Sequence, residues 1–323
     1  MNKDIFASFI VPIFNDVEKL AVTLDSIGAV VTERPIEIII VDDDGPATNE
    51  ADVYKLLENK GIQTQYLKKQ NEGPYYARKY GFSKASGDYI IFVDCGDAVI
   101  PENCSQVVTE LLSENTIDIL VSDILSVENS VRSRKNILPK KHKAPLNSMP
   151  ASDFFSQCNK NLLGTPGKIY SRATLSSAFA SIDLPPGVCN AEDLLLFTTS
   201  LGYVKQVHYM NGYFYLYEVH EKSLSHDQRP GALQRRFYDK VCVADSVLSV
   251  ISNNKDRGWT SLDGKLHRFF RKYRSSVLLH WIFKFPSDFT VAEKLKVIAY
   301  YVTTGVLFSS MWWKLSKKQF NYD

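Results

Sequence analysis

Residues 36–45 read IEIIIVDDDG, a β-branched run that stops abruptly at three aspartates and a glycine. Two further apolar runs accompany it: residues 6–14 end before Asn15, and residues 89–93 end before Asp94. Runs of this kind are typical of strands covered on both faces, as in a parallel sheet. Helical patterns occupy the segments between them, over residues 18–29, 51–59 and 75–85. This alternation predicts a doubly wound α/β fold for the first half of the chain.

The pattern is more varied beyond residue 100. Pro101 suits the first turn of a helix that runs to Ser113, and residues 117–125 are predicted as another strand. Polar and basic residues 129–150 are predicted as a long loop. Residues 204–219 are rich in Tyr and Val around an Asn-Gly dipeptide, which favours a β-hairpin. From Leu233 onward, apolar residues recur at three- and four-residue steps and predict helices.

The composition is that of a globular protein with a sizeable core. Of the 323 residues, 45% are hydrophobic and 23% are charged, which excludes general disorder. The five cysteines have no Cys-x-x-Cys spacing and are odd in number, which argues against a zinc site or a disulfide framework. A reducing compartment is therefore expected. We expect no secretory signal, because Asp4 precedes a short apolar run that ends at Pro12.

Charge is unevenly distributed along the chain, although the net charge is only +2. Residues 255–323 hold 13 Lys/Arg against 5 Asp/Glu, so the remainder is mildly acidic. A basic end predicts attraction to an anionic surface, for which nucleic acid and anionic lipid are both candidates. The chain has no recognised nucleic-acid-binding motif, and we expect no nucleic-acid partner.

Carboxylates follow two of the predicted strands at the point where each strand ends. Asp42 and Asp43 follow the first, and Asp94 and Asp97 follow the second. In an open α/β sheet this edge faces the ligand-binding crevice. Such oxygen ligands suit Mg²⁺ or Mn²⁺, which bind through one or two carboxylates together with substrate phosphates. The alternative for any single aspartate is a solvated turn or a helix cap.

Six short segments follow one another along the chain: SFIVPIFN at residues 8–15, IVDDDG at 40–45, NEGPYYAR at 71–78, FVDCGD at 92–97, GKIY at 167–170 and AED at 191–193. This ordered set resembles family-two inverting glycosyltransferases of bacterial polysaccharide synthesis. The resemblance covers residues 6–226 and implies a Rossmann-like GT-A fold. That fold is a mixed α/β sheet with helices on both faces, here followed by a helical C-terminal extension.

The resemblance assigns donor-side roles to five residues. Pro12 would line the nucleotide site, and Asp42 and Asp43 would contact the uracil and the ribose of a nucleotide sugar. Arg78 would lie near the base or the diphosphate, where a guanidinium suits phosphate. Asp94 would contact the ribose or a metal ion.

The resemblance also implies the chemistry. Asp193 would be the general base that takes the proton of the acceptor hydroxyl, and Glu192 would raise the pKa of that base or serve a role of its own. Inversion needs a single displacement, with one base opposite a diphosphate leaving group whose charge needs a cation. The alternative is that the two acids only favour a helix N-terminus through the dipole.

One departure from the family pattern concerns the metal site. The family carries an aspartate where this chain has Gly96, so Asp97 is the predicted second metal ligand beside Asp94. If Asp97 does not take that role, metal binding is weak or the enzyme is degenerate. The family also has a basic residue and a serine that touch the diphosphate further on, for which His220 and Ser223 are the candidates.

Together these features predict a nucleotide-sugar and acceptor domain at residues 1–226 and a helical region at residues 227–323. The expected activity is inverting hexosyl transfer from a UDP-sugar to a hydroxyl of a lipid-linked or free glycan, such as an O-antigen or capsule chain. The donor sugar stays open among Glc, Gal, GlcNAc and GalNAc. The alternative is an inactive relative that binds nucleotide sugars or acts as a scaffold.

The C-terminal region predicts contact with a membrane surface. Residues 297–313 carry no charge and end in a Trp pair that lysines follow. The run is shorter and more polar than a spanning helix of about 20 apolar residues. An interfacial helix at the cytoplasmic face is therefore favoured, which makes the protein peripheral. Packing on the catalytic domain or within an oligomer, and a transmembrane helix, are the alternatives.

Overall fold

The computed structural model describes most of the chain up to residue 294. The described residues are 5–15, 17–46, 48–58, 61–113, 117–139, 146–219, 230–254, 260–285, 290, 291 and 294. Two predicted donor-site residues, His220 and Ser223, and the uncharged run at residues 297–313 lie outside the described residues, so the predictions about them stay predictions.

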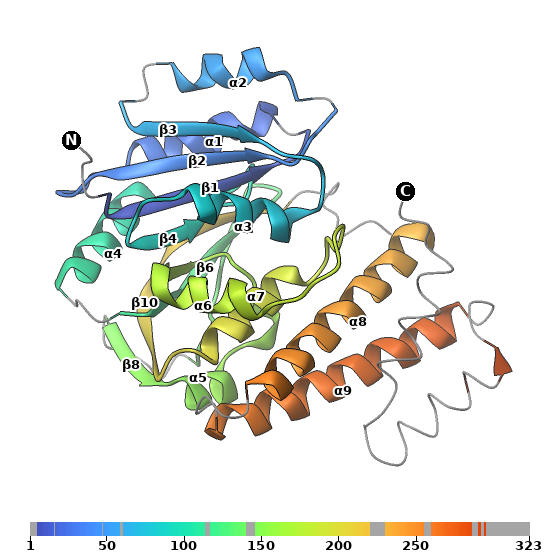
Figure 1. Ribbon diagram of the computed structural model, residues 1–323. Coiled ribbons are helices and arrows are strands. Elements are labelled where there is room, and N and C mark those ends of the chain that lie inside the picture. Colours follow the sequence, from blue (N-terminus) through green and yellow to red (C-terminus); the bar gives the residue numbers. More distant parts are fainter. Residues whose placement is uncertain are drawn as a thin grey trace.

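One mixed sheet forms the centre of the described structure (Figure 1). Its strands are β1 (Ala7–Ile13), β2 (Ile36–Asp42), β3 (Gln63–Lys68), β4 (Tyr89–Phe92), β5 (Ala98–Val99), β6 (Ile119–Glu128), β7 (Val131–Lys135), β8 (Leu146–Pro150), β9 (Lys168–Ser171) and β10 (Gln206–Glu218). The strand order is β3-β2-β1-β4-β9-β6-β10-β5, with β7 beside β6 and β8 beside β10. Strands β1 to β4 pair in parallel, whereas β9 is antiparallel to both of its neighbours.

Helices cover both faces of this sheet, as the sequence predicts. They are α1 (Val17–Gly28), α2 (Glu50–Leu57), α3 (Pro74–Lys84), α4 (Pro101–Ser113), α5 (Ala151–Gln157), α6 (Arg172–Ser181), α7 (Glu192–Leu201), α8 (Pro230–Asn253) and α9 (Thr260–Lys284). Along β1, Phe9 and Val11 pack into a cluster with α1, α2 and α4. Ile10 points the other way, into a cluster with α3 and α5 to α9. This alternation is the two-residue period of a strand that is buried on both sides.

Helix α3 lies close against the sheet because of a glycine. A Cβ at Gly81 would lie 2.6 Å from Ile10 Cγ2 and 3.0 Å from Val41 Cγ2, so a larger residue would push α3 away from β1 and β2. Arg78 lies three residues earlier and therefore on the same side of the helix. The close approach of α3 thus turns the Arg78 side chain toward the carboxyl edge of the strands.

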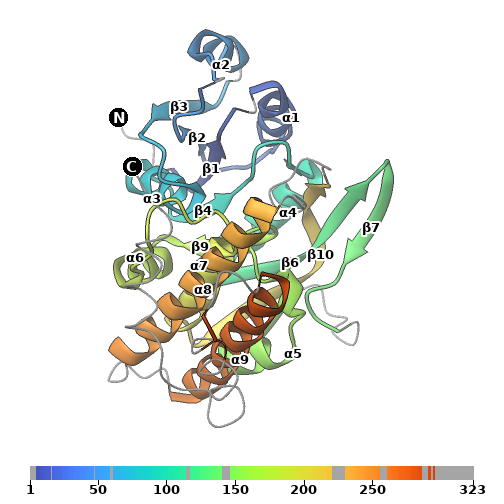
Figure 2. The same ribbon diagram turned by 90° about the vertical axis from the view of Figure 1, so that its right-hand side faces the viewer.

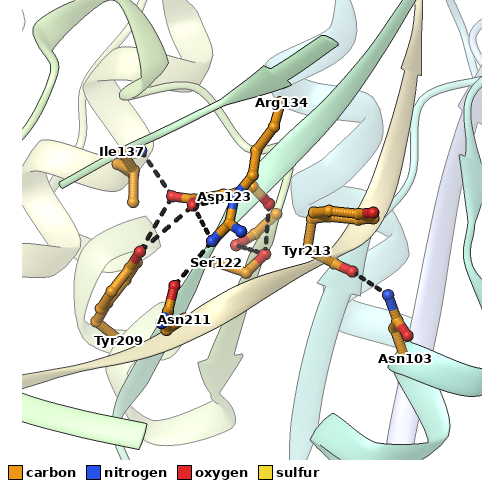
Figure 3. A network of polar contacts seen from close by, with 9 residues as sticks. Asn103, Ser122, Asp123, Arg134, Ile137, Tyr209, Asn211 and Tyr213 are labelled. Atoms are coloured by element: carbon orange, nitrogen blue, oxygen red, sulfur yellow. Dashed lines mark hydrogen bonds and ion pairs between the residues drawn. The ribbon is translucent and has the colours of Figure 1, made fainter. Parts of the chain in front are cut away.

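The predicted loop at residues 129–150 is wrong at both of its described ends, which form β7 and β8. The side chains of β7 are exposed, so no apolar alternation in the sequence marks it as a strand. Its pairing with β6 is supported by a polar network in which Arg134 Nε lies 2.8 Å from the fully buried Asp123 carboxylate (Figure 3). The backbone N–H of Ile137 and the Tyr209 hydroxyl also donate to Asp123. A buried carboxylate is costly without such partners, and β7 supplies one of them.

The predicted hairpin at residues 204–219 is also wrong, because residues 206–218 form the single strand β10. The Asn211-Gly212 dipeptide lies where the register of β10 against β6 shifts between Met210 and Tyr213. It therefore accompanies a β-bulge instead of a turn. The side-chain oxygen of Asn211 accepts a hydrogen bond from Arg134 at 2.8 Å (Figure 3).

Helices α8 and α9 lie side by side against the face that carries α5 and α7 (Figures 1 and 2). Phe270 and Trp281 of α9 are buried in the same cluster as Phe154 and Phe197. The described part of the C-terminal region therefore shares a core with the first 226 residues, and the domain boundary at that point stays a prediction. Among the helices of the described residues, none has the length and apolar character needed to cross a membrane.

Candidate functional site

Arg78 is the centre of a buried ion-pair network that joins three elements. Its Nη2 lies 2.7 Å from Asp94 Oδ1 at the end of β4, and its Nη1 lies 2.8 Å from Glu192 Oε1 at the start of α7. The side chains of Arg78 and Glu192 are 5% and 7% exposed, whereas that of Asp94 is 37% exposed. The network therefore brings the predicted donor side and the predicted base side together, with Asp94 as the member open to solvent.

The charges of this network hold one another in place. Burial lowers the pKa of Arg78, but the carboxylates of Asp94 and Glu192 outweigh burial and leave that pKa raised. Burial raises the pKa of Glu192, the charge of Asp193 raises it further, and Arg78 opposes the rise. Removing one partner of a buried ion pair typically costs about 3–5 kcal/mol, because the other charge is then left unpaired. The guanidinium is thus a fixed cation between two carboxylates.

The nucleotide-side residues lie where the sequence places them, at the carboxyl ends of β1 and β2. Pro12 pairs in register with Val41, and the Asp43 N–H donates to the Ile13 carbonyl at 3.0 Å. The Asp42 carboxylate accepts hydrogen bonds from the Gly45 N–H and the Tyr66 hydroxyl. This edge is adjacent to the junction of β1 and β4, where strand order reverses and ligands of open α/β sheets bind.

Asp43 links that edge to the helix that carries Arg78. Its carboxylate accepts from the Gly73 N–H at 2.7 Å, from the Glu72 N–H at 3.1 Å and from Lys69 Nζ at 2.9 Å. Gly73 has φ 95°, in the region that favours glycine, and is followed by Pro74 at the first position of α3. Asp43 therefore positions the start of α3, and its contact with a nucleotide stays a prediction.

Asp94 and Asp97 differ in their freedom to bind a cation. Asp97 is buried, and its two carboxylate oxygens accept from the Tyr215 hydroxyl at 2.7 Å and from the Glu218 N–H at 2.9 Å. Burial and the charge of Asp94 raise the pKa of Asp97 to about 8. Asp94 uses Oδ1 for Arg78, and among the described residues nothing binds its Oδ2. One open carboxylate fits a Mg²⁺ or Mn²⁺ ion that takes its remaining ligands from phosphate and water.

No cluster of three or more His, Cys, Asp or Glu side chains able to hold a metal ion occurs within the described ranges. A cation at this edge would therefore depend on Asp94 together with donor phosphates. Asp97 as a second ligand stays a prediction that requires the side chain to leave Tyr215 or Glu218. The hydrogen bond from Tyr215 to Asp97 could not be predicted from the sequence, because the two residues lie 118 positions apart.

Asp193 is the second residue of α7 and lies beside a glycine that makes room for it. The preceding Ala191 has φ 66°, an uncommon conformation for a residue with a side chain, and turns the chain into the helix. Asp193 Oδ1 accepts from the Leu194 N–H at 2.7 Å. A Cβ at Gly164 would overlap Asp193 Oδ2. The loop between Leu162 and Lys168 thus defines where the predicted base can lie.

Lys168 holds that loop from inside the protein. Its side chain is buried, and its Nζ donates to the carbonyls of Leu162 at 3.0 Å and Pro166 at 2.9 Å. Burial lowers the pKa of Lys168 to about 7, while the charge of Asp193 opposes that shift. These two carbonyls flank Gly164, so Lys168 positions the backbone against which Asp193 lies. Residues 164–168 read Gly-Thr-Pro-Gly-Lys, a pattern that indicates a turn or loop but not the contacts that Lys168 makes with it.

The sequence profile described as Glycosyl transferase family 2 matches residues 8–169, which is half of the chain. This chain belongs to glycosyl transferase family 2. The matched region contains the ends of β1, β2 and β4, the helix that carries Arg78, and the loop of Gly164 and Lys168. The Glu192–Asp193 pair follows it.

Two curated relatives support this membership over shorter stretches. An uncharacterized glycosyltransferase of Rickettsia bellii is 35% identical over 97 residues, covering 29% of this chain and 13% of its own length. The minor teichoic acid biosynthesis protein GgaB of Bacillus subtilis is 33% identical over 124 residues, covering 38% of this chain and 14% of its own length. The chain thus spans about a seventh of these relatives.

The fold has a close counterpart among solved structures. S. aureus TarS 1–349 in complex with UDP-GlcNAc superimposes with a TM-score of 0.63 over 91% of this chain and 79% of that one. The two sequences are 17% identical, so the similarity shows the shared fold. The GT-A arrangement predicted from the sequence is therefore confirmed for this member of family 2.

The first prediction concerns the glycine beside the predicted base. We expect Gly164→Ala to displace the Asp193 carboxylate and lower the kcat of glycosyl transfer by about 10-fold to 100-fold, the scale of a misplaced catalytic group. Donor affinity should stay within about twofold, because Gly164 does not touch the nucleotide-side residues. Steady-state rates and donor titration separate the two effects. Gly28→Ala is the control, because a Cβ there meets nothing within 4 Å. Unchanged kcat in Gly164→Ala would contradict the positioning role.

The second prediction concerns the stability contributed by Lys168. Its pKa is about 7 in the folded protein and about 10.5 in the unfolded chain, so the unfolded chain binds more protons between these values. The free energy of unfolding should therefore rise with pH in this window, by up to about 1.4 kcal/mol per pH unit relative to Lys168→Met. Urea unfolding at pH 7 to 9.5 measures the difference, and Lys265→Met is the exposed-lysine control. A difference that does not change with pH would show that burial does not perturb Lys168.

Proposed function

We propose that the protein is an inverting glycosyltransferase that moves a hexose from a UDP-sugar to a hydroxyl of a surface glycan. The observation that supports this most is the Arg78 bridge, which joins the strand-end carboxylate Asp94 to the Glu192–Asp193 pair. A donor at the carboxyl ends of β1, β2 and β4 would then have its sugar beside Asp193. UDP as the nucleotide is in line with TarS, whose structure with UDP-GlcNAc shares this fold.

Asp193 is the proposed general base. It is only partly buried, and it is held at the start of α7 by the Leu194 N–H, so a carboxylate oxygen can face an incoming hydroxyl. The base removes the hydroxyl proton as that oxygen attacks the anomeric carbon, and the bond from that carbon to the diphosphate breaks on the opposite side. Glu192 is committed to Arg78, so it acts as a positioning residue for the network.

Asp94 is the proposed protein ligand of a divalent cation beside the donor diphosphate. The ion would offset the charge that develops on the leaving diphosphate. Arg78 sets the orientation of Asp94 through Oδ1 and leaves Oδ2 for the metal. Gly96 supplies no ligand, so a single carboxylate would make metal binding depend strongly on bound donor.

The proposed acceptor is a lipid-linked glycan of a bacterial surface polymer, in line with the teichoic acid protein GgaB among the relatives. We further propose that the basic C-terminal region attaches the protein to the cytoplasmic face of the membrane. Lys and Arg near an anionic surface contribute about 1 kcal/mol each. Flotation with anionic vesicles at low salt tests this attachment, and a protein that stays unbound would argue against it.

The third prediction tests the base. Asp193→Asn keeps an oxygen for the Leu194 N–H but cannot take a proton, so we expect kcat to fall by about 10²–10⁴ while donor affinity persists. Initial rates and calorimetric donor titration measure the two quantities. Asp153→Asn is the matched control, because Asp153 also lies in the first turn of a helix and is exposed. Near-normal turnover by Asp193→Asn would exclude the assignment.

The fourth prediction identifies the donor and tests the metal. Nucleotide release should be measured with UDP-Glc, UDP-Gal, UDP-GlcNAc and UDP-GalNAc, each with Mn²⁺ and with excess chelator. We expect turnover of one donor, loss of that turnover in chelator, and a higher Mn²⁺ requirement for Asp94→Asn. Full activity in chelator would refute the metal role. Donor binding without turnover of any donor, with acceptor present, would instead indicate a nucleotide-sugar-binding relative.

A further inference from the structure

A basic cavity lies between α8 and α9. Its volume is about 340 Å³, and its lining includes Arg236 and Lys240 of α8 and His280 and Lys284 of α9. The other described lining residues are mainly aromatic or aliphatic: Leu233, Phe237, Tyr273, Ser276 and Val277. Among the described residues that line the cavity, none is acidic. The size is that of a small-molecule site, and the lining combines apolar walls with a few cationic groups.

The two acidic residues of α8 do not line this cavity. Asp239 pairs with Arg235 at 3.0 Å, and Asp245 pairs with Arg274 at 2.6 Å, so these carboxylates are committed elsewhere. Within the described ranges, Lys240 forms no ion pair. Burial lowers its pKa, and the neighbouring charge of Arg236 lowers it further. Gathering like charges in a half-buried cavity costs free energy that a bound anion would recover.

The helix that forms one wall of the cavity is tied to the segment that leads to the proposed base. Asp239 of α8 accepts from Asn190 Nδ2 at 2.7 Å and from the Cys189 N–H, which ties α8 to the segment just before Glu192 and Asp193. Burial raises the pKa of Tyr273, and the charge of Asp193 raises it further, so this wall lies within electrostatic reach of the proposed base.

We propose that the α8–α9 cavity binds a phosphate or diphosphate ester, carried either by the acceptor or by a membrane lipid. Arg and Lys side chains form short, charge-assisted hydrogen bonds to phosphate oxygens, and a neutral ligand cannot accept hydrogen bonds of this strength. Phe237 and Tyr273 offer an apolar surface to the group that the phosphate joins. The inference rests on the proposed function, because an acceptor that binds beside the base Asp193 would lie within electrostatic reach of Tyr273 in the cavity wall.

Direct binding tests the chemistry of the cavity without turnover. The full-length protein is saturated with UDP, which fills the donor side, and is then titrated calorimetrically with geranyl diphosphate, with geraniol as the uncharged control. We expect geranyl diphosphate alone to bind, and Lys240→Gln and Lys284→Gln each to weaken it by about tenfold, the effect of one charged hydrogen bond. Lys272→Gln removes an exposed charge of α9 outside the cavity lining and should leave binding unchanged.

Equal binding of geranyl diphosphate by the Lys240→Gln, Lys284→Gln double variant and the unaltered protein would overturn the proposal, as would equal binding of geraniol. Lys284 is exposed at the end of α9, so its substitution tests the site even if Lys240→Gln impairs folding. Because no transfer is measured, a failure of the proposed glycosyl transfer would not affect this result.

A second arm identifies the source of the phosphate. Binding to phosphatidylglycerol vesicles, with phosphatidylcholine vesicles as the control, is compared between Lys284→Gln and Lys272→Gln. A selective loss for Lys284→Gln assigns the cavity to a membrane headgroup. If the two variants bind vesicles equally, and Lys284→Gln has a higher KM only for acceptors that carry a phosphate, the cavity binds the phosphate of the acceptor. Failure of Lys284→Gln to alter probe, vesicle or acceptor binding contradicts both assignments.

Discussion

A buried guanidinium must be paired, and in this protein that requirement connects the whole site. Arg78 lies on α3, and its partners lie at the end of β4 and at the start of α7, the latter 114 residues further along the chain. Because an unpaired buried charge is strongly unfavourable, α3, β4 and α7 are stable in these positions only together. The fold and the geometry of the site therefore depend on the same interaction.

A second set of contacts decides where the proposed base lies within this framework. Lys168 holds the carbonyls on either side of Gly164, and the missing side chain of Gly164 leaves room for Asp193. Ala191 adopts φ 66° just before α7, a conformation that costs a non-glycine residue free energy and is typical of functional sites. The position of the Asp193 carboxylate therefore depends on the space beside Gly164, on the buried amine of Lys168 and on the strained backbone at Ala191.

The C-terminal helices extend this arrangement instead of forming a separate core. Phe270 and Trp281 pack into the cluster that contains residues of α5 and α7, and Asp239 of α8 binds the segment before Glu192. The apolar face of the described part of α9 is therefore used in packing. Among its basic residues, Arg274 pairs with Asp245, Lys265 pairs with Asp153, and Lys284 lines the α8–α9 cavity.

The sequence by itself determined the elements whose signals are local. The apolar runs that form β1, β2 and β4, the helices from α1 to α4, and the acidic residues at the strand ends could all be read from neighbouring residues. The tertiary structure alone decided β7 and the unbroken course of β10, because pairing with β6 makes the polar residues near Arg134 a strand and turns Asn211-Gly212 into a bulge. It also decided which carboxylates Arg78 joins and which loop Lys168 supports. Periodicity and residue type are properties of short segments, whereas a partner many residues away is selected only when the chain packs.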